Sequence, residues 1–348
     1  MIFRVLNKRN IGEWAETASS FPADNLTIFH TPEYLMSWED YESADPICLY
    51  MEENGTKFLY PFLKKGISGY SHDNIFDISS AYGYGGVVSS SVNPDSNLIQ
   101  QVNHLVDEWC KSENIIAEFI REYPAPSYIR NSEMTHVRNN LIFHYDGFRE
   151  NYAGKLKKRA VRDAKSSVKK GCEASIDLKL DSLGGFINLY KNVSAVKEFS
   201  GFYNFNMTYF NSILKYLRAN SFIINIAYNG KTVASSLNFA YGDSITYHLS
   251  ASDYDFKNLL PNDLMLFTLI DYGGKNGYNH VFLGGGLSED ENDPLFLFKE
   301  KYATNTVPVH IGKKIHNGFI YDAVCDEWAN KYPDKKPLYS KFFLKYRF

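Results

Sequence analysis

The chain changes character abruptly at Asp146-Gly147. A strand-like run of apolar residues, Leu141–Tyr145, precedes this point, and a strongly basic segment, 151–170, follows it and ends at Gly171. A chain of 348 residues also exceeds the roughly 250–300 residues that one hydrophobic core usually serves. We therefore predict two domains, with the boundary near residue 148.

Both halves show the apolar spacing of mixed helices and strands. In the first half the pattern predicts a helix at 98–110 and strands at 58–63, 85–88 and 115–120. In the second half it predicts helices at 183–193, 208–218, 264–272 and 295–302, and strands at 222–228, 233–241, 244–249 and 280–283. Asn229-Gly230 is a strong hairpin signal between two of these strands, and Gly273-Gly274 is expected to end the third helix.

Composition excludes several classes of protein. Hydrophobic residues make up 44% of the chain, charged residues 22%, and the net charge is −3, so a folded core is expected and wholesale disorder is excluded. The apolar runs are far shorter than the roughly 18 residues that cross a bilayer. Charges within the first ten residues argue against an export signal. We expect a cytoplasmic protein.

The four cysteines are scattered along the chain, at Cys48, Cys110, Cys172 and Cys325. They form no CxxC pair and no Cys/His cluster, which argues against both a disulfide framework and a zinc site. We expect free buried thiols and no bound metal.

The basic segment carries eight cations within sixteen residues: Lys155, Lys157, Lys158, Arg159, Arg162, Lys165, Lys169 and Lys170. Only Asp163 opposes them. Positions 155, 158, 162, 165 and 169 share one face of a helix, with Leu156, Ala160, Ala164 and Val168 as its packing face. Like charges at these spacings cost a few tenths of a kcal/mol per pair, so we expect the face to meet an anion such as phosphate; a solvated charged face is the alternative.

Tyrosine is abundant, and aromatic residues make up 16% of the chain. Tyr82 and Tyr84 lie among glycines in the segment 79–86, where backbone and rings can approach a sugar or nucleotide. Two alternatives explain the same pattern without a ligand: a general excess of tyrosine in the chain, and an ordinary turn that follows a strand. The segment lacks the spacing of GxGxxG and of GxxxxGK[ST], so neither of those nucleotide sites is indicated.

Polar residues gather at the end of the strand predicted at 244–249: His248, Ser250, Ser252 and Asp253, with Lys299 in the last short helix of the same half. His248 and Asp253 are candidates for a general base by residue type. The chain contains neither GxSxG nor HExxH, so serine-hydrolase and metalloprotease functions are not indicated.

Five segments, in their order and spacing, resemble the Fem-type transferases of the GNAT-like acetyltransferase superfamily, which join acyl or aminoacyl units to amines of cell-envelope precursors. They are 81–86, 117–124, 158–165 with Lys170-Gly171, 247–253 and 297–302. The resemblance implies an α/β (α+β) fold of two tandem GNAT-like domains with mixed central sheets flanked by helices. It places them at 1–148, which 320–348 would complete, and at 149–319.

The same resemblance implies site residues. Tyr82, Tyr84 and Arg121 would bind the acceptor, Arg159 and Arg162 would approach its phosphates, and Lys299 would hold the donor or stabilise the oxyanion. Amide formation needs an amine, an aligned carbonyl and hydrogen-bond donors, but neither a metal nor a covalent intermediate. Asp253, His248, a substrate carboxylate or water could take the ammonium proton.

The donor stays open between acyl-CoA and aminoacyl-tRNA. The usual glycine-rich coenzyme A turn is missing at 257–262, which leaves aminoacyl-tRNA as a donor, but a net charge of −3 provides no broad basic surface for RNA. The leading hypothesis is an N-acyltransferase acting on a nucleotide- or lipid-linked sugar or envelope precursor. The alternatives are a non-catalytic protein that binds a phosphoglycan or a partner, and a nucleic-acid or anionic-membrane contact through the basic helix. The sequence leaves the oligomeric state open.

Overall fold

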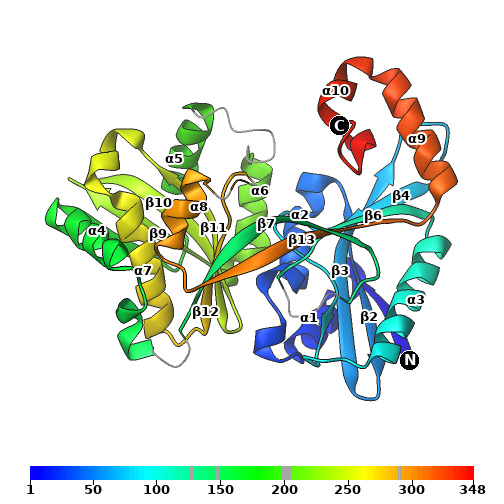
Figure 1. Ribbon diagram of the computed structural model, residues 1–348, viewed down its shortest axis with the longest axis horizontal. Helices are drawn as coiled ribbons and strands as arrows, with labels where there is room; N and C mark the ends of the chain where they lie inside the picture. The colour runs from blue at the N-terminus through cyan, green and yellow to red at the C-terminus, as the bar shows by residue number, and fades with distance from the viewer. Residues whose placement is uncertain (125–128, 146–148, 197–204, 289, 291) are drawn as a thin grey trace. The chain divides into compact units, whose positions relative to one another are not determined.

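The computed structural model describes residues 1–124, 129–145, 149–196, 205–288, 290 and 292–348 (Figure 1). The chain divides into two compact units: unit 1 comprises Met1–Val137 and Val309–Phe348, and unit 2 comprises Arg138–Pro308. The predicted limits of the domains, 1–148 and 149–319, stay a prediction.

Unit 1 contains a mixed sheet with helices on its faces. Its helices are α1 (Ile11–Ser19), α2 (Pro32–Glu42), α3 (Ser96–Ser112), α9 (Gly318–Lys331) and α10 (Lys336–Tyr339). Its strands are β1 (Ile2–Asn7), β2 (Asp45–Glu53), β3 (Thr56–Ile67), β4 (Ile75–Ser79), β5 (Val88–Ser89) and β6 (Ile115–Arg121), together with the end of β13 (Asn305–Ile315). The strand order is β1-β2-β3-β4-β6-β13, and β5 pairs with β3.

Unit 2 begins within β7 (Glu133–His144) and also contains a mixed sheet. Its helices are α4 (Lys158–Lys169), α5 (Leu183–Val196), α6 (Met207–Ser212), α7 (Pro261–Lys275) and α8 (Pro294–Glu300), with a π-helix at Ile213–Leu217 and short 3-10 helices that include Arg149–Gly154 and Tyr254–Leu259. Its other strands are β8 (Cys172–Asp177), β9 (Ser221–Tyr228), β10 (Lys231–Tyr241), β11 (Ser244–Ser252) and β12 (His280–Gly284). The order is β7-β12-β11-β10-β9-β8.

The two sheets repeat one pattern. In each, four strands pair antiparallel in sequence order, β1 to β4 and β8 to β11. A helix, α3 or α7, then leads to a strand that pairs parallel with the fourth: β6 with β4, and β12 with β11. A last antiparallel strand follows, β13 on β6 and β7 on β12. This repetition gives the two tandem GNAT-like folds that the sequence led us to expect.

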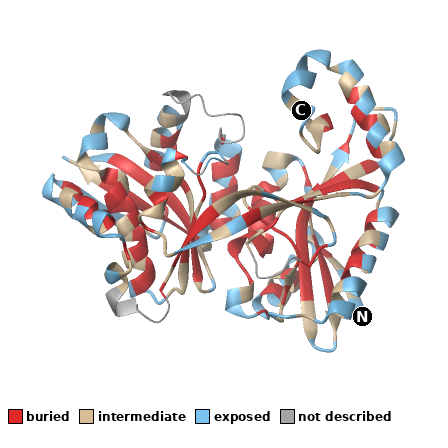
Figure 2. Ribbon diagram, viewed as in Figure 1, coloured by how far each residue is buried: buried red, intermediate tan, exposed pale blue. Residues whose placement is uncertain are grey.

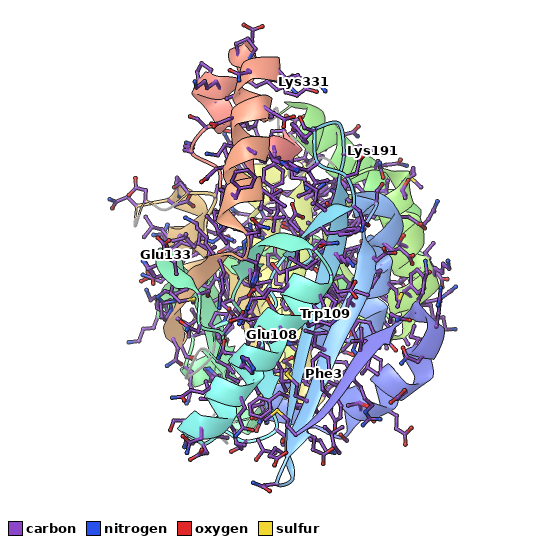
Figure 3. All side chains as sticks on the ribbon, turned by 90° about the vertical axis from the view of Figure 1, so that its right-hand side faces the viewer. Phe3, Glu108, Trp109, Glu133, Lys191 and Lys331 are labelled. Carbon is purple, nitrogen blue, oxygen red and sulfur yellow. The ribbon has the colours of Figure 1, made fainter. Side chains whose placement is uncertain are left out.

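Apolar faces hold each unit together, as the red inward sides of the ribbons show (Figure 2). In unit 1, α3 packs Val102, Val106 and Trp109 against strands β2 to β4, and the Trp109 ring lies 5.4 Å from that of Phe62. Figure 3 shows Trp109 and its neighbour Glu108 on this helix. Asp95 caps the first turn, accepting the N–H of Asn97 at 2.8 Å.

The basic helix differs from its prediction in length and in its packing face. It begins at Lys158 rather than 151, because residues 149–154 form a 3-10 turn and Lys157 is extended, with ψ 135°. It packs through Ala160, Asp163, Ala164 and Ser167, while the side chain of Val168 is 56% exposed. Residues four apart drift by about 40° per step around a helix, so the fourth member of a row leaves the face.

Gly273-Gly274 does not end α7, contrary to the sequence prediction. The helix runs on to Lys275, and the chain turns at Gly277, where φ is 80°. A Cβ atom on Gly273 would lie 2.3 Å from the Tyr145 hydroxyl oxygen, so this glycine permits close packing instead. The Asn229-Gly230 hairpin is confirmed, with φ 50° and 76°.

The structure also bears on several other predictions from the sequence. The helix predicted at 208–218 is α6 followed by the π-helix and a 3-10 turn, and the strand predicted at 85–88 is reduced to a bridge at Gly85 and to β5. All four cysteines are buried and free. Within the described part of the chain, no helix is both long and apolar enough to span a membrane.

Candidate functional site

In unit 2 the parallel strands β11 and β12 separate after three residue pairs. They pair from Ser244 with His280 to Thr246 with Phe282, and β11 then continues to Ser252 with β10 as its partner. β12 instead stays with β7 as far as Gly284. In open α/β sheets, ligands commonly bind outside the carboxyl ends of the strands, which is the end where this pair separates.

A glycine turn and a short helix place Lys299 at this divergence. Asp293 caps α8, accepting the N–H groups of Leu295 and Phe296 at 2.9 Å each, and it also accepts those of Leu287 and Ser288 at 3.0 Å each. A Cβ atom on Gly286 would lie 2.5 Å from Asp293 Oδ1, so the turn needs glycine there. Asp293 therefore ties the turn to the helix.

The Lys299 side chain is nearly buried, with the residue 8% exposed. Its Nζ donates to the Gly285 carbonyl oxygen at 2.9 Å and lies 5.4 Å from the centre of the Tyr247 ring. Burial, together with the positive charge of Arg138, lowers the pKa of this amine to about 7, and the charge of Asp293 partly offsets these two effects. Near neutral pH the amine is therefore present both as an ammonium, which donates hydrogen bonds, and as a free base.

His248 lies on the opposite face of β11 from Tyr247 and Lys299. The ladder shifts here, since Leu237 pairs with Leu249 and Asn238 with Tyr247, and His248 is the extra residue of this β-bulge. Its ring lies 4.4 Å from that of Phe239 and its Nε2 contacts the Tyr209 hydroxyl. Burial lowers the pKa of His248 to about 3, so its imidazole is neutral.

Asp253 lies at the far end of β11. It caps the 3-10 helix that follows, accepting the Asp255 N–H at 3.2 Å, and pairs with Lys231 at 2.9 Å. The hydrogen bond from Lys231 is the main cause that lowers the pKa of the carboxyl. Asp253 lies six residue steps along the extended chain from Tyr247, or roughly 20 Å. The structure therefore does not bring Asp253, His248 and Lys299 together.

The basic helix presents its cations to solvent. The side chains of Arg159 and Arg162 are each 72% exposed, and both reach Asp163, at 3.4 and 3.0 Å. Asp163 also lies 3.6 Å from Lys301 Nζ. Lys170 at the end of the helix donates to the Asn258 carbonyl oxygen at 2.5 Å, linking α4 to the segment that leads into α7.

In unit 1 the tyrosines of 79–86 are packing residues. Tyr84 is buried, with its ring 5.3 Å from that of Phe29 and 6.0 Å from that of Tyr123. Tyr82 is partly exposed and stacks on Trp38 at 5.4 Å. Arg121 is also partly exposed and donates to the Gly83 carbonyl oxygen at 3.3 Å.

In unit 1 the parallel strands β4 and β6 stay connected beyond their last paired residues, whereas β11 and β12 of unit 2 separate. Beyond the last pair of β4 and β6, Gly85 forms a parallel bridge with Glu122, and Tyr123 donates its N–H to Gly85 at 2.9 Å. The 79–86 segment thus closes this end of the β4–β6 pair. The open end of the parallel pair in unit 2 is therefore the candidate site.

One buried group of unit 1 has the residue types of a metal site. Ligand atoms of Cys110, Glu118 and His316 lie within 4.8 Å of one another. Glu118, however, already accepts hydrogen bonds from Arg130 at 2.8 and 2.7 Å and from Tyr60 at 2.7 Å. A cation beside Arg130 would meet a positive charge, so this group does not fit a metal. Its members are far apart in sequence, which hid the cluster from motif analysis.

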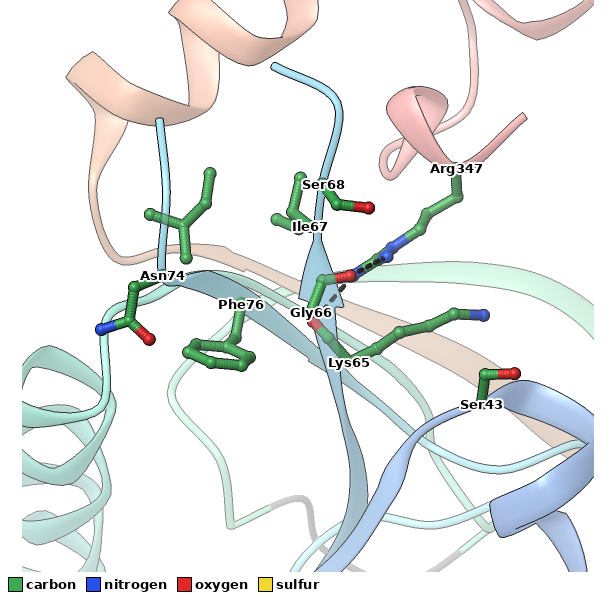
Figure 4. A pocket seen from close by; sticks show the side chains of 9 residues that line it. Ser43, Lys65, Gly66, Ile67, Ser68, Asn74, Phe76 and Arg347 are labelled. Carbon is green, nitrogen blue, oxygen red and sulfur yellow. Dashed lines mark hydrogen bonds between the residues drawn. The ribbon is translucent and has the colours of Figure 1, made fainter. Parts of the chain in front are cut away.

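A hollow of about 500 Å³ in unit 1 contains none of the predicted site residues (Figure 4). Its lining includes Lys65, Phe76 and Arg347. The Arg347 guanidinium is fully engaged, with Asp77 at 2.9 and 2.8 Å and with the Gly66 and Lys65 carbonyl oxygens at 2.5 and 2.8 Å. The hollow thus offers no unused charge for a ligand at this arginine.

Sequence reasoning identified Lys299 but not the residues that define its setting. Tyr247, Arg138 and Asp293 surround it, and of these only Asp293 leaves a local signal, since an aspartate before Pro294 is a common helix cap. Arg138 and Tyr247 reach the site through strand pairing, which single-sequence motifs do not report.

Comparison with known proteins agrees with this architecture. Residues 155–292 match the family described as acetyltransferase (GNAT) domain. The chain is similar to the crystal structure of FemX, with a TM-score of 0.69 and 13% identity over 92% of this chain and 99% of that one. No curated protein sequence matches it.

Two further solved structures share the fold. One is the C-terminal domain of a putative lysylphosphatidylglycerol synthetase from Agrobacterium fabrum, with a TM-score of 0.58 and 12% identity over 94% of this chain and 97% of that one. The other is a conserved protein of unknown function from Bacteroides thetaiotaomicron, with a TM-score of 0.58 and 9% identity over 90% and 99%.

Proposed function

We propose that the chain is a member of the Fem-type, GNAT-like family and an N-acyltransferase that forms an amide on an amino group of a phosphate-bearing cell-envelope precursor. The observation that carries the proposal is the buried Lys299 amine where β11 and β12 diverge. The similarity to a putative lysylphosphatidylglycerol synthetase supports an aminoacyl group as one candidate donor and a lipid as one candidate acceptor.

The reaction would proceed by direct attack. The lone pair of the acceptor amine forms a C–N bond with the donor carbonyl carbon, and the C–S or C–O bond to the carrier then breaks. A base takes the proton that the amine nitrogen loses and passes it to the sulfur or oxygen of the leaving carrier. Lys299, as an ammonium, would donate to the oxyanion that develops on the carbonyl oxygen, an effect commonly worth about 10²–10³-fold in rate.

The start of α7 bears on the donor. Leu260 before it has a left-handed conformation at φ 61°, and Pro261 contributes no N–H. In the first turn Asp263 is buried, and pairs with Lys301 at 2.6 Å and Tyr302 at 2.8 Å. A pyrophosphate at this helix end would meet a carboxylate, which favours a donor whose phosphates bind elsewhere. Acyl-CoA and aminoacyl-tRNA are both included in the test below.

The remaining assignments follow the resemblance. Arg159 and Arg162 would contact acceptor phosphates. The partly exposed Tyr82 and Arg121 stay candidates for binding the acceptor, whereas Tyr84 is buried against Phe29 and Tyr123 and is not offered to a ligand. Because neither Asp253 nor His248 lies beside Lys299, a substrate carboxylate or water is the favoured base, and substitution of Asp253 or His248 by Asn or Gln would test this. A non-catalytic binding protein is the competing function, since the exposed arginines serve both equally.

The test is transfer by the purified protein. Acyl-CoAs and charged tRNA are each combined with amino-sugar nucleotides, and products are detected by mass spectrometry. We expect an amide product that Lys299→Met reduces by about 10²–10³-fold in kcat while acceptor binding is retained. The control is Lys275→Met, which changes an exposed lysine paired with Asp271. Acceptor binding without any product would support the binding protein instead.

A further inference from the structure

Residues 331–348 in unit 1 are both basic and aromatic. Their cations are Lys331, Lys335, Lys336, Lys341, Lys345 and Arg347, against Asp334 as the one acidic side chain. Their aromatic residues are Tyr332, Tyr339, Phe342, Phe343, Tyr346 and Phe348. The whole chain has a net charge of −3, so this segment stands out as positive on an otherwise acidic protein.

The inner side of this segment is fixed to unit 1. Arg347 pairs with the buried Asp77 at 2.8 Å, the Tyr70 hydroxyl donates to the Tyr346 carbonyl oxygen at 2.8 Å, and the Trp328 indole donates to that of Phe348 at 3.1 Å. The outer side is therefore presented on a firm support beside α9, whose last residue, Lys331, is labelled in Figure 3.

The outer side carries exposed lysines around an exposed leucine. Leu338 is 65% exposed, and Lys335, Lys336 and Lys341 are exposed around it. Among the residues that the structure describes, these three lysines form no ion pair with a carboxylate. We call Lys335, Lys336, Leu338 and Lys341 the outer patch.

Three partly buried rings support the outer patch. Tyr339 and Phe348 stack at 4.6 Å with their planes 14° apart, and Phe342 lies 5.0 Å from Phe348. Aromatic rings of this kind favour the boundary between water and lipid, where an apolar body and a polar rim are both accommodated.

We propose that the outer patch docks this protein on an anionic lipid bilayer. Lysines attract anionic headgroups, and an exposed leucine between them gains by entering the boundary of the acyl chains. A nucleic acid would use the same charges but has no use for Leu338, and the faces of Tyr339 and Phe348 are already turned to each other rather than open to bases. The surface lies in unit 1 alone and does not depend on the transfer reaction.

Vesicle binding tests the proposal. The full chain is sedimented with vesicles of phosphatidylcholine alone and of phosphatidylcholine with 30% phosphatidylglycerol. We expect binding to the anionic vesicles only, and added salt should weaken it. The patch variant combines Lys335→Ala, Lys336→Ala and Lys341→Ala, and each replacement should weaken binding on the order of fivefold. The matched control replaces the exposed Lys8, Lys111 and Lys275 by Ala, which removes the same charge elsewhere.

A second measurement reports insertion itself. Leu338→Cys is labelled with an environment-sensitive fluorophore, which is selective because the four native cysteines are buried. A blue shift on anionic vesicles supports docking. The proposal is overturned if the fluorophore shows no shift, if the control triple variant loses as much binding as the patch variant, or if the patch variant loses binding to tRNA and not to vesicles.

Discussion

Arg130 holds Glu118 through two hydrogen bonds, Nε to Oε1 at 2.8 Å and Nη2 to Oε2 at 2.7 Å, and the two side chains are 1% and 0% exposed. His316 contacts the same carboxylate at 2.9 Å. Burial acts to raise the pKa of Glu118, but the charge of Arg130 and the hydrogen bonds from His316 and Arg130 outweigh it and lower the pKa to about 2. The buried carboxylate is therefore ionised and fully partnered.

Removing the charge of Glu118 should destabilise unit 1. Glu118→Gln leaves the buried Arg130 with Asp107, at 2.6 Å, as its remaining carboxylate, and we expect the free energy of unfolding in urea to fall by about 3 kcal/mol. The parent's own stability should decline as the pH falls from about 4.5 toward 2, because the unfolded carboxyl takes up a proton before the folded one does. Glu108→Gln, in the exposed pair with Lys111, serves as control and should change nothing measurable.

Glu122 should behave in the opposite way. It is 4% exposed, and its Oε1 is buried without a hydrogen-bond partner among the described residues. Burial and the charge of Glu118 raise its pKa to about 8, against a lowering by Arg130. Between pH 4.5 and 8 the Glu122 carboxyl keeps its proton in the folded protein but is ionised in the unfolded chain. The contribution of this carboxyl to the free energy of unfolding is therefore highest below pH 4.5 and declines as the pH rises to 8.

The variant Glu122→Gln isolates this effect, because an amide cannot ionise. We expect parent and variant to be similarly stable near pH 4.5 and the variant to be more stable at pH 8, as measured by urea unfolding across that range. Parallel curves for the two proteins would contradict a protonated Glu122. Glu133→Gln, an exposed glutamate of the same unit, is the control.

Lys299 should reduce stability at neutral pH. Its folded pKa of about 7 lies below the usual 10.5, so between these values the unfolded amine holds a proton that the folded amine has released, and stability rises with pH. Lys299→Met should therefore melt at a higher temperature than the parent at pH 7, by an amount that shrinks toward pH 10. A lower melting temperature would mean that the amine is stabilising where it lies. This readout needs no substrate.

The two exposed arginines of α4 should contribute to phosphate binding. Replacing both Arg159 and Arg162 by Ala should raise the Kd for a sugar nucleotide by about tenfold in calorimetry, since each hydrogen bond to a charged group contributes modestly at an exposed site. The loss should be smaller at high salt. Replacement of Lys275 by Ala provides the control, and an equal loss there would show that only overall charge matters.

Local patterns predicted the elements of the fold well. Asn229-Gly230 specified its hairpin because both positions need positive φ, and the spacing in 98–110 specified α3 because its apolar face has the helical period. Gly273 misled because a glycine in a helix also permits close packing, and the sequence does not show that Tyr145 lies against it. Val168 misled because a row of residues four apart rotates away from the neighbouring helix.

The amino-acid sequence by itself therefore determined where helices, strands and turns form, where charges cluster along the chain, and which residue types are available for catalysis or binding. Only the tertiary structure decided that Lys299 meets Tyr247, that His248 faces the other way and that Glu118 finds Arg130. The reason is that these partners come from strands and helices distant in sequence. Their proximity depends on pairing register and packing, and the burial that results, rather than the residue type, sets the charge state of each group.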